Sequence, residues 1–117
     1  MTYELITSPV DARALVRSTL GHLRPELVDS AVLLTSEVTT YALLHSLDHV
    51  GLAVDVQHGA VRVEVQDGDA LNVLEDAEFG RGEPDELRRV ILERVATTWG
   101  VESRERGKAA IWFTLAL

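Results

Sequence analysis

The sequence predicts one α+β domain over residues 1–117, a two-layer α/β sandwich in which helices cover one face of a mostly antiparallel sheet. Residues 52–66 alternate between apolar and polar side chains around a His-Gly pair, which is typical of an antiparallel hairpin with one buried face. Residues 25–45 instead carry apolar side chains at helical spacing. The predicted order is strand, helix, helix, strand, strand, helix, strand, strand. A chain with this order most simply packs its helices on one face of the sheet.

The chain opens with a predicted strand and a predicted helix. Residues 2–7 favour a short edge strand. Ser8 is expected to cap the helix that follows, with Pro9 in its first turn and Asp11 completing a capping-box-like pair. Gly21 is expected to end this helix. Its apolar side is formed by Ala12, Leu15, Val16, Leu20 and Leu23.

The helix at residues 25–45 organises the rest of the chain, and Pro25 suits its first position. Its apolar stripe consists of Leu27, Ala31, Leu34, Val38 and Ala42. Glu37 borders this stripe, with Tyr41 one turn further on. The pattern alone equally fits a solvated glutamate beside a core helix.

The hairpin is followed by a long connection and a third helix. The hairpin is expected to bury Leu52, Val54, Val56, Val61, Val63 and Val65. Residues 70–83 are acidic and show no period, which predicts a long loop of the kind that is often functional. A helix should open at Pro84 and take Gly100 as its C-cap, with Arg88 and Arg89 on a solvated face. Its buried ridge is Leu87, Ile91, Val95 and Trp99.

Two extended segments complete the predicted fold. One begins at Val101, and the last strand spans residues 108–117. The last strand is expected to face the core through Ala109, Ile111, Phe113, Leu115 and Leu117. Trp112 is expected on the opposite face of the sheet.

Composition restricts the partners that the chain can bind. A net charge of −8 argues against nucleic acid and anionic membranes, and favours a partner protein with a basic face. The absence of cysteine excludes disulfides and suits the cytoplasm. The N-terminus lacks the features of a signal peptide, and we expect no apolar stretch long enough to span a bilayer.

Four blocks of sequence carry a resemblance to a known family. They are SEVTTYALLHS at 36–46, VEVQDGD at 63–69, TTWGV at 97–101 and GKAAIWFTL at 107–115. In order and spacing they resemble the bacterial anti-sigma-factor serine kinases of the histidine-kinase-like ATPase superfamily. The resemblance covers Ser8 to Leu115 and implies that family's fold, an α/β sandwich with ATP between the helices and a lid loop.

The first two family motifs are only partly present. Glu37 matches the family's general base, and His45 matches a histidine that often follows. The position of the magnesium-binding asparagine is Tyr41, whose phenol is a poor ligand for a hard cation, so no metal is expected. Asp67 matches the aspartate that binds adenine, but Asp69 stands at one of the glycine positions that should follow.

The remaining motifs also depart from the family. Gly107 and Lys108 match its Gly-Lys pair, whereas Ala109 replaces the threonine that commonly follows. The family's Gly-Arg-Gly is missing near Glu86, Leu87 and Arg88, and the start of the third helix carries Glu83, Asp85 and Glu86. Two like charges about 5 Å apart at an effective dielectric near 20 repel by roughly 3 kcal/mol, so these carboxylates oppose a triphosphate.

These departures suggest a regulatory protein that has kept the anti-sigma kinase scaffold, lost ATP binding and turnover, and acts by binding proteins. It would be a catalytically inactive pseudo-kinase without a cofactor. Its expected partners are a sigma factor, an anti-anti-sigma protein, a related kinase-like subunit, or a second copy in a homodimer. Its vestigial site would comprise Glu37, Tyr41, Asp67, Asp69, Gly107 and Lys108.

Two alternatives remain open. The first is an active ATP-dependent serine kinase with a divergent pocket, in which Glu37 deprotonates a partner serine, Asp67 holds adenine and Mg-ATP is the cofactor. The second is an unrelated α+β binding domain.

Overall fold

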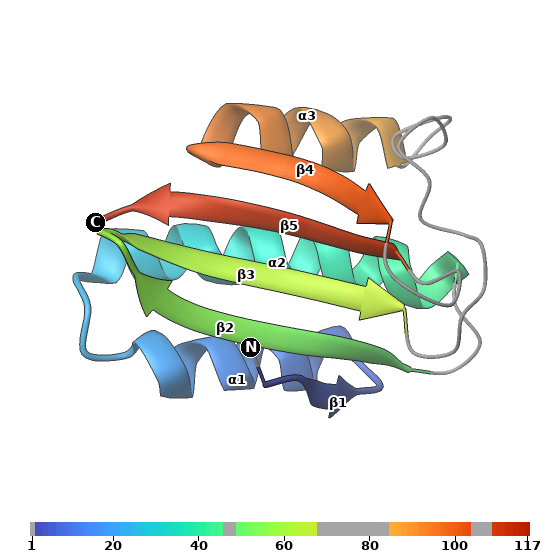
Figure 1. Cartoon of the computed structure of the whole chain (residues 1–117), viewed down its shortest axis with the longest axis horizontal. Coiled ribbons are helices and arrows are strands. Elements are labelled where there is room, and N and C mark those ends of the chain that lie inside the picture. Colours follow the sequence, from blue (N-terminus) through green and yellow to red (C-terminus); the bar gives the residue numbers. More distant parts are fainter. Residues whose placement is uncertain (1, 46–48, 68–84, 104–108) are drawn as a thin grey trace.

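A computed structural model of the chain describes residues 2–45, 49–67, 85–103 and 109–117, and its elements follow the predicted order (Figure 1). They are β1 (Glu4–Ile6), α1 (Pro9–Leu20), α2 (Pro25–His45), β2 (Val50–Gln57), β3 (Ala60–Asp67), α3 (Asp85–Val95), β4 (Thr98–Ser103) and β5 (Ala109–Ala116). The strands form one antiparallel sheet in the order β1-β2-β3-β5-β4. The predicted α+β class is confirmed.

The three helices share one core with one face of the sheet. In Figure 1, α2 crosses behind β3 and β5. Buried residues of all three helices, among them Val16, Leu34 and Leu92, belong to the same cluster as Val63 and Phe113 of the sheet. This common core makes the molecule a two-layer sandwich.

The local signals around α1 act as predicted. The Ser8 hydroxyl accepts a hydrogen bond from the Asp11 N–H at 3.2 Å, so Ser8 caps the helix. Gly21 follows the last residue of α1, but it keeps a right-handed backbone with φ −61°. Its role at the helix end therefore does not depend on the left-handed conformation that only glycine adopts easily.

Helix α2 is the core helix of the fold, and every residue of its predicted stripe is buried. We expected no apolar stretch long enough to span a bilayer, and this was wrong: by length and composition alone, α2 is long and apolar enough. Its 21 residues include an 18-residue window with a mean hydropathy of 1.3, half of it buried. The buried face is broader than one stripe because α2 packs against both α1 and the sheet.

The hairpin is confirmed and extends over β2 and β3, with Val54 opposite Val63. Its turn residues, His58 and Gly59, both have positive φ, at 53° and 74°. This is the backbone of a type I′ turn, whose twist matches that of the flanking strands. The predicted core residue Val56 is 37% exposed, because it lies near the turn.

The prediction for residues 96–100 was wrong. Helix α3 ends at Val95, and Trp99 lies in β4, where it pairs with Phe113. Gly100 is therefore not a helix cap: it faces Trp112 across the ladder, and a Cβ there would lie 2.9 Å from the indole ring. The predicted helix was too long because Trp99 lies four residues after Val95, which continues the helical spacing. The same residue also fits the alternation of a strand.

The face of the sheet away from the helices is covered by its own side chains. The Arg62 guanidinium lies 4.4 Å from the centre of the Trp112 ring and 2.9 Å from Glu64. The Tyr3 hydroxyl donates to the Glu64 carboxylate at 2.6 Å, and Glu64 is only 4% exposed. Trp112 lies on this face as predicted. Leu117, which was expected in the core, is 52% exposed at the end of the chain described.

Candidate functional site

Glu37, Tyr41 and His45 follow one another at four-residue spacing along α2, on the side of the helix that meets α3. Four-residue spacing places their side chains one above the next. The C-terminal end of α2, the end of β3 and the start of α3 lie at the same end of the molecule (Figure 1). His45 and Asp67 thus end two elements at the same end of the molecule as the start of α3.

Arg88 of α3 lies between two carboxylates. Its Nη1 donates to Asp85 Oδ1 at 2.7 Å, and its Nε lies 3.4 Å from Glu37 Oε2. The Nε contact lacks hydrogen-bond geometry, so the attraction between Arg88 and Glu37 is electrostatic. The Arg88 side chain is 14% exposed, and the prediction that it lies on a solvated face was wrong.

Asp85 extends the network to the end of α2. Its Oδ2 lies 3.1 Å from Nε2 of His45, whose ring centre is 4.4 Å from that of Tyr41. The network therefore runs from Glu37 through Arg88 and Asp85 to His45, and it joins α2 to the first turn of α3. We call these four residues the α2–α3 network.

Tyr41 is a core residue. It is 1% exposed and among the largest fully buried side chains of the described part of the chain. The position that the resemblance gives to a magnesium ligand is therefore filled by an aromatic ring inside the hydrophobic cluster. A magnesium ligand must instead present its oxygen to a hydrated ion.

Of the other predicted site residues, only the backbone of Asp67 belongs to the described part of the chain. Asp67 ends β3 and pairs through its backbone with Val50. Asp69, Gly107 and Lys108 lie outside the described residues, as does Glu83. In the described segments, no group of three metal-ligating side chains could hold a metal ion.

The start of α3 is less repulsive to anions than its sequence suggests. Asp85 and Glu86 both lie in the first turn, but the charge of Asp85 is offset by Arg88. Asp85 is also engaged by His45, so its carboxylate serves helix packing. An anion that approached here would have to displace this contact, in addition to overcoming the repulsion of Glu86.

Arg88 was not predicted as a site residue, although the sequence contains a signal for it. Arg88 lies one turn before Leu92, the buried residue of α3, on the same helix face. An arginine on the buried stripe of a helix requires a partner, and Glu37 was the available carboxylate at the edge of α2.

Neither a scan against models of known protein families nor a search of characterised proteins finds a match to this chain. The site must therefore be interpreted from its own geometry. That geometry engages the Glu37 carboxylate with a guanidinium and buries the Tyr41 ring. It favours a helix-packing contact over a catalytic base with a bound nucleotide.

Proposed function

We propose that this chain is a cytoplasmic bacterial regulatory protein of the anti-sigma kinase type, with a histidine-kinase-like ATPase fold, that acts by binding another protein. Its partner would be a sigma factor, an anti-anti-sigma protein, a related kinase-like subunit or a second copy. Nucleotide binding and turnover would be lost. The four sequence blocks support the family, and the α+β layering is compatible with it.

One observation supports the proposed loss of nucleotide binding. Glu37 and Tyr41, the positions that would supply a base and a magnesium ligand, are both used to pack the helices. A general base must reach the proton that it removes, and Arg88 lies against the Glu37 carboxylate. The net charge of −8 also favours a basic partner protein over a polyphosphate.

The alternative of an active serine kinase has one observation in its favour. The Glu37 side chain is still 28% exposed, so part of it remains accessible to solvent. In that reading Arg88 would move away when Mg-ATP binds, and Asp67 would hold the adenine.

Thermal unfolding with and without Mg-ATP distinguishes the two functions. A ligand at a hundred times its Kd stabilises a protein by about 2.7 kcal/mol, which for a domain of this size raises Tm by roughly 10 °C. We expect millimolar Mg-ATP to leave Tm where magnesium alone leaves it. A rise of several degrees that disappears in Asp67→Asn would overturn the proposal and establish the kinase alternative.

A further inference from the structure

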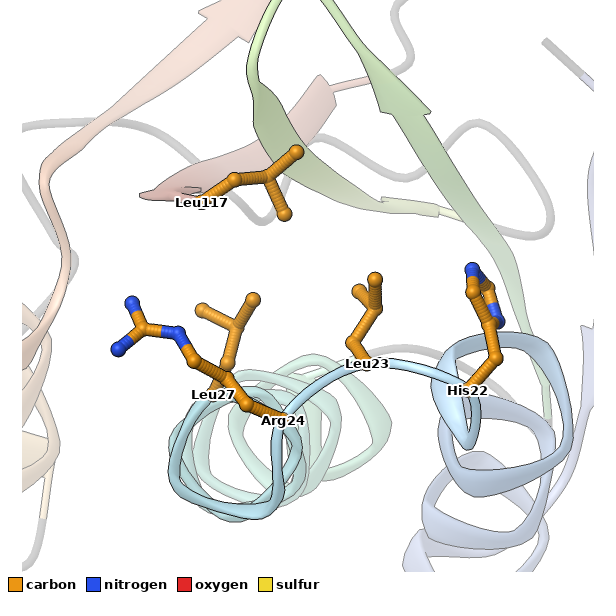
Figure 2. Close-up of a pocket in the computed structure, with 5 residues that line it drawn as sticks. All are labelled: His22, Leu23, Arg24, Leu27 and Leu117. Carbon is orange, nitrogen blue, oxygen red and sulfur yellow. The ribbon is translucent and has the colours of Figure 1, made fainter.

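An open pocket lies at the N-terminal end of α2, where the α1–α2 connection lies near Leu117. It is a cavity of about 340 Å³ (Figure 2). Its lining consists of His22, Leu23, Arg24, Leu27 and Leu117. Leu27 precedes His45 by eighteen positions, which is about 27 Å along a helix, so the cavity is separate from the α2–α3 network.

The interior of the cavity is apolar. The side chains of Leu23 and Leu27 point into it from below in Figure 2, and Leu117 covers them from the opposite side. The volume lies within the range of small-molecule sites, in which apolar walls bind the body of the ligand and a few polar groups orient it. Leu117 is 52% exposed, so a ligand would remove apolar surface from water there.

The polar groups at the edge of the cavity favour an anion. Arg24 and His22 lie at opposite edges in Figure 2, and neither has an ion-pair or hydrogen-bond partner among the described residues. By contrast, the guanidinium groups of Arg62, Arg88 and Arg89 all have carboxylate partners. The described residues therefore leave the exposed Arg24 guanidinium available to an anion at the edge of the apolar cavity.

Arg24 also lies at the start of α2. Its carbonyl oxygen accepts hydrogen bonds from the N–H groups of Leu27 and Val28 at 3.1 and 3.2 Å, so Arg24 directly precedes the first turn, where the helix dipole is positive. The guanidinium and the dipole act in the same direction, and both attract negative charge. A carboxylate suits the planar guanidinium because it can accept two parallel N–H bonds.

We propose that this cavity binds a small apolar monocarboxylate, with its alkyl chain between the three leucines and its carboxylate against Arg24. The apolar interior excludes nucleotides and sugars, whose polar groups would be left without partners. This inference does not depend on the proposed regulatory function, because the cavity shares no residue with the α2–α3 network.

A titration of the ¹⁵N-labelled chain with octanoate tests the proposal by NMR. We expect saturable shifts confined to the amides of residues 22–27 and 117, with a Kd near or below about 1 mM. Hexanoate should bind about tenfold more weakly, since it buries two fewer methylene groups. Octylamine, which has the same chain and the opposite charge, should not bind.

Three variants separate the contributions of charge and of the apolar wall to octanoate binding. Arg24→Gln should weaken octanoate binding about tenfold, whereas Arg17→Gln, which replaces an exposed arginine outside the cavity, should leave it unchanged. Leu117→Asp should abolish binding by placing a carboxylate in the cavity, and its amide spectrum reports whether the fold is intact. Unsaturable shifts, equal binding of octylamine, or unchanged binding in Arg24→Gln would each overturn the proposal.

Discussion

Two threonines of α2 bury their hydroxyl groups without a hydrogen-bond partner among the described residues. They are Thr35 and Thr39, and both are fully buried. By contrast, the hydroxyl of Thr40, also on α2, donates to the Ser36 carbonyl oxygen at 2.7 Å. The same residue type on one helix is thus satisfied at one position and unsatisfied at two others.

Replacing either buried threonine by valine should therefore stabilise the chain. Valine keeps the shape and removes a hydroxyl whose desolvation is not offset, so we expect a gain of about 1 kcal/mol in the free energy of unfolding per site. Urea unfolding of Thr35→Val and Thr39→Val measures it. The matched control is Thr40→Val, which loses a made hydrogen bond and should be neutral or less stable.

A loss of stability in both Thr35→Val and Thr39→Val would contradict this account. It would mean that the two hydroxyls have partners that the described residues do not include.

At the scale of elements, α3 is held by few contacts. Leu92 is its only buried residue in the described chain, while Leu87 is 60% exposed. Ile91 and Val95 are partly buried against the same core, and the α2–α3 network adds polar contacts at the first turn. Helix α3 thus has one fully buried side chain, whereas α2 has nine buried residues between Leu27 and Ala42.

Leu92→Ala should consequently weaken the packing of α3 against the core. Truncation of a fully buried leucine destabilises by about 2–5 kcal/mol, and we expect a loss in this range in chemical unfolding. Leu87→Ala, in the same helix but on its exposed side, should change stability by less than about 0.5 kcal/mol. Equal effects of the two substitutions would show that α3 does not pack through Leu92.

The elements themselves were predictable where one physical signal dominated. The Ser8 cap, the stripe of α2 and the alternation around His58-Gly59 each specify a local structure, and each is confirmed. The end of α3 was not predictable, because Trp99 fits both a helical ridge and the alternation of β4. Only its pairing with β5, a contact distant in sequence, decides between the two.

The candidate site was predictable only in part, for a similar reason. The pattern identified Glu37 and Tyr41, but it gave neither the burial of the Tyr41 ring nor the position of Arg88. Both depend on how α3 docks against α2, which no local pattern encodes. Asp69, Gly107 and Lys108 remain predictions, since they lie outside the described residues.

At the scale of the whole molecule, the two ends of α2 have different properties. One end carries the α2–α3 network, in which opposite charges meet. The other end carries the apolar cavity with Arg24 and His22 at its edge. On the sheet face away from the helices, Arg62 forms an ion pair with Glu64, and the Tyr3 hydroxyl donates to the same carboxylate. The fold thus leaves positive charge unpaired at the cavity end of an acidic protein.

The central claim is that Glu37 serves to dock α3, and a double-mutant cycle between Glu37 and Arg88 tests it most directly. Glu37→Gln and Arg88→Gln should each lower the free energy of unfolding by about 1 kcal/mol. The double variant should lose less than the sum, with a coupling of at least about 0.5 kcal/mol. The exposed Arg89–Glu93 pair is the control, and its coupling should be smaller.

Two results of this cycle would be incompatible with a docking role for Glu37. Additive losses, or a Glu37→Gln variant that is more stable than the parent chain, would contradict the account. A gain in stability is what removal of a catalytic group often produces, because such groups are kept for activity at the expense of stability.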